Sequence, residues 1–205
     1  MEHWLRTDEA QQAVLALEMA SKQLPRVTAN PHHWQWVIIG LHNALQGFMV
    51  LALCGTNDLN VLTDDCAKEW LAAYERGDDK YPEPKLDKFL NLYKKIKSDR
   101  MKMYVNSQPF KPSGTQGRSI KKLNSLRNEF IHFVPKGWSL EVSGLPQIVD
   151  DCLDAISFLA VECGNVIWHD SALETRTREI IKNAKRDASL IKRNYGAQPV
   201  HAGDG

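Results

Sequence analysis

One short segment combines residue types that could cleave a phosphodiester bond. Arg127 and Asn128 are followed, after three further residues, by His132. Imidazole titrates near neutral pH and can carry a proton, whereas the guanidinium of arginine is always charged and matches phosphate oxygens with its planar fork. The pattern therefore predicts Arg127, Asn128 and His132 as candidate catalytic residues.

The spacing of these residues leaves their arrangement open. Asn128 and His132 are four residues apart and share a helix face, whereas Arg127 lies about 140° round an ideal helix from His132. Either Arg127 reaches round, or the helix loosens near Pro135, or the second set of groups comes from another subunit. A purely structural role is the alternative, because Arg and His near a helix C-terminus complement its dipole.

The segment that leads into this motif is strongly basic. Residues 85–122 contain eleven Lys or Arg and two Asp, a net charge of +9, while the rest of the chain carries −8 and the whole chain only +1. Overall charge therefore gives no attraction to nucleic acid or to anionic membranes. Locally, the segment is either a solvated helix face or a phosphate-binding surface.

Hydrophobic periodicity predicts an all-α protein. The chain has 205 residues, of which 43% are hydrophobic and 25% charged, enough for a domain with a sizeable core. Short connections between amphipathic helices favour an antiparallel bundle. We expect one domain over residues 1–195, with its core at about 30–168, and a disordered tail at 196–205. The expected helices span residues 8–24, 31–55, 63–76, 86–105, 120–134, 145–168 and 172–194, with a long loop at 106–119.

Composition and spacing argue against several other classes of protein. The four cysteines form no CxxC pair and have no histidine at ligand spacing, so we expect reduced thiols, no metal and no cofactor. The N-terminus lacks the basic and apolar regions of a secretory signal. The most apolar stretch, residues 37–54, carries His42, Asn43 and Gln46, which favours a buried helix over a membrane span. We therefore expect a cytoplasmic protein without a membrane partner.

Further residues with chemical potential have simpler explanations. His42 on an apolar helix is typical of a hydrogen-bonded core histidine, and we retain it as a possible orienting group for the site. Trp138 could stack a nucleobase, but a core role is the simpler interpretation. His32 beside Trp34 suggests packing at a helix start. The lysine-rich stretch is expected to form a solvated face, made of Lys94, Lys95, Lys97, Arg100 and Lys102.

The run from Arg127 to His132, Arg-Asn-Glu-Phe-Ile-His, resembles the R-x4-6-H motif of the HEPN superfamily (higher eukaryotes and prokaryotes nucleotide-binding). The polar residue after the arginine is the type that the motif prefers. The order of elements is also similar, with an early apolar helix, a charged helix pair, a motif helix and a closing helix over residues 34–168. The resemblance implies a HEPN-like antiparallel bundle, here with additional N- and C-terminal helices.

The resemblance also implies an activity, that of a metal-independent endoribonuclease. In a two-fold homodimer, His132 would act as general acid or base, Arg127 would stabilise charge on the phosphate, and Asn128 would orient the site. The implied substrate is single-stranded or looped RNA, cut through a 2′,3′-cyclic phosphate. The basic residues expected to bind flanking RNA phosphates are Arg118, Lys121 and Lys122.

Two alternatives to a ribonuclease remain open, and the resemblance also bears on a partner protein. Many relatives are inactive modules that bind RNA, a nucleotide or a protein, and a purely structural helical protein would make the basic segment incidental. The resemblance admits an antitoxin or nucleotidyltransferase partner. Family members that the nucleotidyltransferase modifies carry tyrosine two residues after the histidine, where this chain has Val134.

Overall fold

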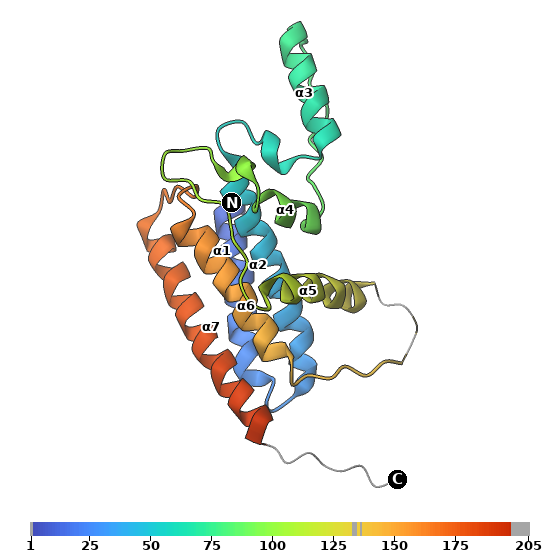
Figure 1. Cartoon of the computed structure of the whole chain (residues 1–205), viewed down its shortest axis with the longest axis vertical. Coiled ribbons are helices and arrows are strands. Elements are labelled where there is room, and N and C mark those ends of the chain that lie inside the picture. The colour runs from blue at the N-terminus through green and yellow to red at the C-terminus, as the bar shows by residue number, and fades with distance from the viewer. Residues whose placement is uncertain (1, 133–134, 136, 198–205) are drawn as a thin grey trace.

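The computed structural model describes residues 2–132, 135 and 137–197, which form an all-α helical bundle (Figure 1). Seven α-helices lie in this part of the chain, and its sole β-type pairing is an isolated bridge between Leu62 and Leu86. The all-α prediction is confirmed. The α-helices are α1 (Glu9–Gln23), α2 (Trp34–Cys54), α3 (Asp64–Arg76), α4 (Phe89–Lys95), α5 (Gln116–Ile131), α6 (Leu145–Ser157) and α7 (Ser171–Ala197).

Four helices, α1, α2, α6 and α7, form the body of the bundle and are called its long helices here. The pairs α1–α2 and α6–α7 are each antiparallel and lie side by side, while α5 crosses the body and α3 projects from one end (Figure 1). Buried side chains of all four long helices join one hydrophobic core, to which α4 and α5 also contribute. The crossing of α5 brings its last turns beside α2 and α4.

The first two helices begin where capping residues predict. The Asp8 carboxylate accepts a hydrogen bond from the Gln11 N–H at 2.7 Å, and the Asn30 side chain accepts from the His32 N–H at 3.0 Å. A 3₁₀ turn at Pro31–His33 leads directly into α2. The two helices approach closely at Gly47, where a Cβ atom would lie 2.7 Å from the Ala13 Cβ.

The segment Pro31–Cys54 is long and apolar enough to cross a membrane by length and composition. In the bundle, however, 61% of its most apolar window is buried inside the protein. Its buried face includes Leu41, Leu45 and Phe48, which lie at the spacing of one helix face. The segment has the burial of a core helix.

The expected helix at 86–105 is much shorter in the structure, where α4 covers only Phe89–Lys95. The chain turns because the Ile96 carbonyl accepts the Phe110 N–H at 2.9 Å, and Ser98 then caps a separate 3₁₀ turn at Asp99–Met101. The prediction of Lys95 on a solvated face was also wrong. Lys95 is 7% exposed, and its ammonium group lies 2.7 Å from the Asp87 carboxylate.

Two further boundaries differ from the predictions. The expected loop at 106–119 ends earlier, since α5 begins at Gln116, whose side-chain oxygen accepts the Ser113 N–H at 2.8 Å. The expected helix at 145–168 continues beyond α6 as a π-helix, Phe158–Glu162, and then stops. Gly164 has φ +76°, and a Cβ there would lie 2.5 Å from the Asn106 oxygen. Glycine therefore allows the chain to turn against the 102–115 loop.

A buried carboxylate fastens the start of α5 to α6. Asp151, 5% exposed, accepts hydrogen bonds from the hydroxyl groups of Thr115 (2.6 Å) and Ser119, and from the side-chain amide of Gln147 (2.9 Å). These donors satisfy both carboxylate oxygens. Asp151 therefore fixes the position of α5, which carries the motif residues.

The cysteines have the burial expected of structural thiols. Cys66, Cys152 and Cys163 are buried, and all four cysteines are free. Burial raises the pKa of Cys54, the remaining one, to about 12. A thiol with so high a pKa is a poor nucleophile at neutral pH. Of the expected disordered tail, residues 198–205 lie outside the described part of the chain, as does Val134.

Candidate functional site

Two of the three motif residues share a cavity at the last turns of α5. Arg127 and Asn128 line a space of about 780 Å³ between α2, α4 and α5. The Arg127 Nη1 group donates to Asn128 Oδ1 at 3.2 Å, so the two side chains lie together. Lys121 lines the same space from nearly two turns earlier on α5. This space is called the basic cavity below.

The lining of the basic cavity is strongly cationic. Asp87 is the single carboxylate among the described residues of this lining. It lies 2.7 Å from the Lys95 ammonium group and accepts from Asn91 (2.7 Å) and from the Lys88 N–H (2.8 Å). Burial alone would raise the pKa of Asp87, but these partners outweigh it and the pKa lies below its ordinary value. Asp87 is thus ionised, and Lys95 already balances its negative charge. The Lys and Arg side chains that line the cavity are Lys88, Lys94, Lys97, Lys121 and Arg127.

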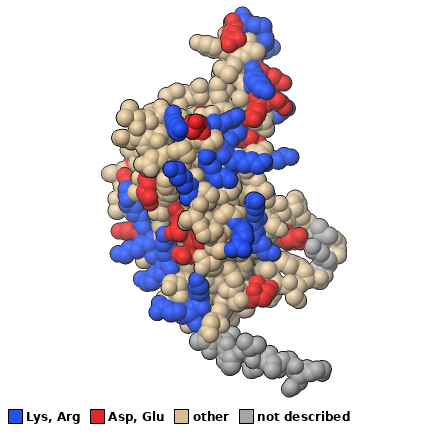
Figure 2. Space-filling view, viewed as in Figure 1, with Lys and Arg blue, Asp and Glu red and all other residues tan. Residues whose placement is uncertain are grey.

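Figure 2 shows Lys and Arg side chains over α4 and α5, the helices that bound the basic cavity, and a second group along α7. Lys97 also lies 4.2 Å from the centre of the Tyr93 ring, a cation–π distance. Lys94 and Lys97 are exposed, as expected of a solvated face, and both also line a concave space beside Arg127. Concavity focuses their field, and the resulting potential attracts anions.

Three buried polar atoms without a hydrogen-bond partner belong to residues in the wall of the basic cavity. They are His42 Nδ1, Tyr93 Oη and Arg127 Nε, and no other buried side-chain nitrogen or oxygen among the described residues lacks a partner. All three residues line the basic cavity. An unpaired buried polar atom is destabilising by about 1–3 kcal/mol, so the wall of this cavity carries a cost in unmet hydrogen bonds.

His42 is held as a neutral imidazole in the wall of this cavity. Its Nε2 lies 3.1 Å from Asn124 Oδ1, an atom that can only accept, so Nε2 carries the proton. Its ring stacks on Phe89 with centroids 4.0 Å apart. Burial, and to a smaller degree the charge of Arg127, lower the pKa of His42 to about 4. His42 therefore lines the cavity as an uncharged group. Its partner, Asn124, lies one turn before Asn128 on α5.

His132 lies apart from the other two motif residues. It is the C-cap of α5, where its N–H donates to the Asn128 carbonyl at 3.2 Å, and its side chain is exposed and does not line the basic cavity. Arg118 and Lys122 are likewise exposed on α5 outside the cavity. The structure thus brings together Arg127, Asn128 and Lys121, but not His132.

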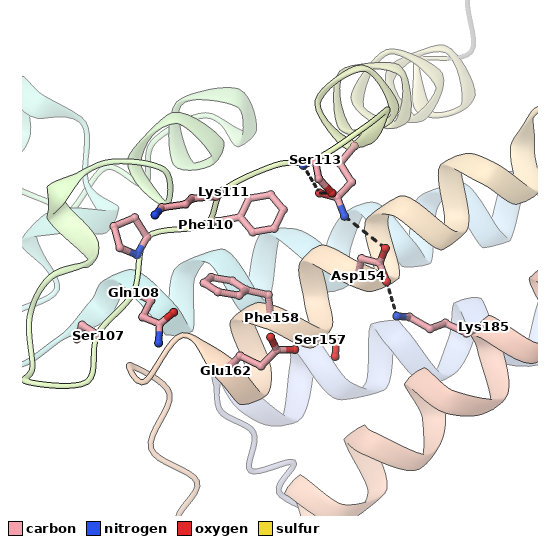
Figure 3. Close-up of a pocket in the computed structure, with 12 residues that line it drawn as sticks. Ser107, Gln108, Phe110, Lys111, Ser113, Asp154, Ser157, Phe158, Glu162 and Lys185 are labelled. Carbon is pink, nitrogen blue, oxygen red and sulfur yellow. Dashed lines mark hydrogen bonds and ion pairs between the residues drawn. The ribbon is translucent and has the colours of Figure 1, made fainter.

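A second polar cavity, of about 500 Å³, lies where the 107–113 segment meets α6 and α7 (Figure 3). Here Asp154 accepts from the Lys185 ammonium group and from the Gln116 side-chain amide at 3.3 Å. Because these charged and polar groups pair with one another, they connect α5, α6 and α7. The basic cavity is therefore the better candidate for a ligand site.

The described residues contain no group of three or more His, Cys, Asp or Glu side chains placed to hold a metal ion. No protein-family model matches this chain, and neither a curated protein nor a solved structure matches it. Function must accordingly be inferred from the site itself.

Proposed function

We propose that this protein is a HEPN-type ribonuclease, which binds single-stranded or looped RNA at the basic cavity and cleaves it without a metal ion. The observation that carries the proposal is the set of five Lys and Arg side chains that line one cavity, Arg127 among them, beside a carboxylate that already has its own partners. A phosphate would accept hydrogen bonds from these side chains and neutralise their charges. The R-x4-6-H resemblance adds the reaction.

In the proposed reaction, the imidazole of His132 takes the proton from a ribose 2′-hydroxyl, whose oxygen then attacks the adjacent phosphorus. The bond from phosphorus to the 5′-oxygen breaks, and that oxygen receives a proton from a second histidine acting as general acid. Arg127 stabilises the negative charge that builds on the phosphate, and Asn128 orients the guanidinium. The products are a 2′,3′-cyclic phosphate and a 5′-hydroxyl.

The separation of His132 from Arg127 favours a homodimer as the active form. On an ideal helix the two positions are about 140° apart, and His132 follows the last residue of α5. A second copy would supply the complementary histidine and close the cleft. We place this dimer in the cytoplasm, with an antitoxin or nucleotidyltransferase as a further partner.

The test is cleavage of a mixed-sequence RNA in excess chelator by the parent protein, Arg127→Ala and His132→Ala. We expect cleavage to fall at least 100-fold in both variants, while only Arg127→Ala also weakens RNA binding. The matched controls are His169→Ala and Lys182→Ala, which change exposed residues outside the cavity. Full cleavage by both motif variants would contradict the proposal.

An inactive RNA-binding module is the second candidate, and the exposed position of His132 outside the basic cavity favours it. It predicts no cleavage by any form of the protein, together with RNA binding that is lost in Arg127→Ala.

Sedimentation tests the two-copy mechanism of the ribonuclease. If the protein is a monomer at micromolar concentration and still cleaves RNA fully, that mechanism is wrong.

A further inference from the structure

A second concave surface lies on the opposite side of the last turn of α5. It is a cleft of about 520 Å³ between the start of α2, the end of α5 and the 138–142 segment. On α5, Glu129 and Phe130 line this cleft, whereas Arg127 and Asn128 line the basic cavity. Although Phe130 lies only about 60° from Arg127 on an ideal helix, the two pairs point on average about 200° apart. The end of α5 thus separates two cavities of different chemistry.

The cleft is aromatic. The Trp138 ring contacts Phe130 with centroids 5.2 Å apart, and 43% of Trp138 is exposed, which contradicts the core role expected for it. Trp34, at the cleft wall, is 1% exposed and held by a hydrogen bond of 3.0 Å from its Nε1 to the Tyr195 hydroxyl. A fixed wall and a half-exposed indole provide a surface on which a flat ring can stack.

Polar groups of the cleft are suited to the edge of such a ring. Gln35 and His32 line the cleft with an amide and an imidazole, and no Lys or Arg belongs to its described lining. A neutral, flat ring with donors and acceptors on its edge fits this lining, and a nucleobase has that chemistry.

We propose that this cleft binds an unpaired base of the RNA whose phosphate occupies the basic cavity. The inference rests on the proposed function and deepens it. An α-helix is about 10–12 Å across with its side chains, a distance that one or two extended nucleotides span. A strand crossing the end of α5 would place a phosphate at Arg127, pass the exposed His132 and stack a base on Trp138.

The test measures RNA binding without cleavage, in the full chain carrying His132→Ala. Fluorescence anisotropy with a labelled eight-nucleotide RNA compares Trp138→Ala, Trp138→Phe and Trp36→Ala. Trp36 is the matched control, because it is 48% exposed on α2 and does not line the cleft. We expect affinity to fall about 10- to 100-fold in Trp138→Ala, to be largely restored in Trp138→Phe and to be unchanged in Trp36→Ala.

A second measurement uses the same RNA made fully abasic. It should bind the parent as weakly as the normal RNA binds Trp138→Ala, and Trp138→Ala should not distinguish the two RNAs. Equal losses in Trp138→Ala and Trp36→Ala, or an abasic RNA bound as well as the normal one, would overturn the cleft as a base site. The inference would also be wrong if folded Trp138→Ala dimerises differently from the parent but binds RNA with the same affinity.

The two proposals fail separately. If Arg127→Ala abolishes RNA binding and Trp138→Ala does not affect it, the cleft inference is wrong and RNA binding at the basic cavity stands. If the parent binds no RNA at low salt, both proposals are wrong. Circular dichroism of each variant confirms that it is folded.

Discussion

The neutral state of His42 follows from its position in the cavity wall. The ring is 1% exposed, stacks on Phe89 and lies near the charge of Arg127, so protonation is opposed by both burial and electrostatic repulsion. Sequence alone identified His42 as a core histidine or an orienting group, and its contact with Asn124 is compatible with either. The Asn124 contact could not be predicted, because it joins residues 82 positions apart in the chain.

His42 makes stability depend on pH. Its pKa is about 4 in the folded chain against an ordinary value of 6.5, so the unfolded chain binds the proton first as pH falls. The stabilising contribution is present above pH 6.5 and is lost as pH falls toward 4, a loss of about 3 kcal/mol in all. Urea unfolding at pH 7 and pH 4.5 should show this loss in the parent and much less of it in His42→Gln. His169→Gln, at an exposed position, is the control and should behave as the parent. Equal losses in the parent and His42→Gln would refute the assignment.

At the scale of the elements, capping and stop signals predicted helix ends wherever contacts are local. Asp8, Asn30 and Thr63 cap the helices that were expected to begin there. The prediction failed where distant residues decide the conformation. The Phe110 N–H binds the Ile96 carbonyl and shortens the helix at 86–105, and no periodicity reports such a bond. In the same way, the sequence indicated Arg127 and Lys121 as phosphate-binding candidates. It could not predict that they line one cavity together with residues of α4.

Asp151 holds α5 in place, and its removal should loosen the site. In Asp151→Ala, the hydroxyl groups of Thr115 and Ser119 lose their acceptor in a buried setting. We expect the free energy of unfolding to fall by about 2 kcal/mol or more. Asp151→Asn, which keeps an acceptor oxygen, should lose less, and Asp99→Ala, at an exposed position, should lose little. Denaturant unfolding measures all three, and an equal effect of Asp99→Ala would contradict the anchoring role.

The contact between α1 and α2 should tolerate no side chain at its glycines. A Cβ at Gly40 would lie 3.0 Å from both the Ala16 oxygen and the Ala20 nitrogen, which are backbone atoms of α1. Gly40→Ala should therefore lower the free energy of unfolding by about 1–3 kcal/mol. The control is Gly117→Ala, where the nearest atom is the Tyr93 hydroxyl at 3.6 Å and the higher helix propensity of alanine should leave stability unchanged or slightly raised. A thermal melt that ranks the two variants in the opposite order would show that the helices can move apart.

At the scale of the whole molecule, charge is distributed unevenly. The net charge is only +1, yet five Lys or Arg side chains line one cavity. Attraction to an anion is therefore local to the α4 and α5 side of the bundle, and salt should weaken it strongly.

The salt dependence of RNA affinity reports how many phosphates these cations contact. If all five engage a single strand, the logarithm of the RNA affinity should fall with the logarithm of salt concentration with a slope of about −3.5. Lys121→Ala should make the slope less steep by about 0.7, whereas Lys182→Ala, on α7 and outside the cavity, should leave it unchanged. Titrations at several salt concentrations test this. The same slope in Lys121→Ala and the parent would remove Lys121 from the RNA contact.

The projecting helix α3 has a consequence for how the chain could be rebuilt. The chain leaves the bundle at Leu62 and returns at Leu86, where the Thr63 N–H binds the Lys85 carbonyl and the Asp87 N–H binds the Val61 carbonyl, both at 2.9 Å. The two ends of this excursion are therefore clasped together at its base. A tight turn could replace residues 65–84 without stretching the backbone, and a foreign domain could be grafted there in the same way. The protein thus carries a natural point of attachment at the end of the bundle from which α3 projects.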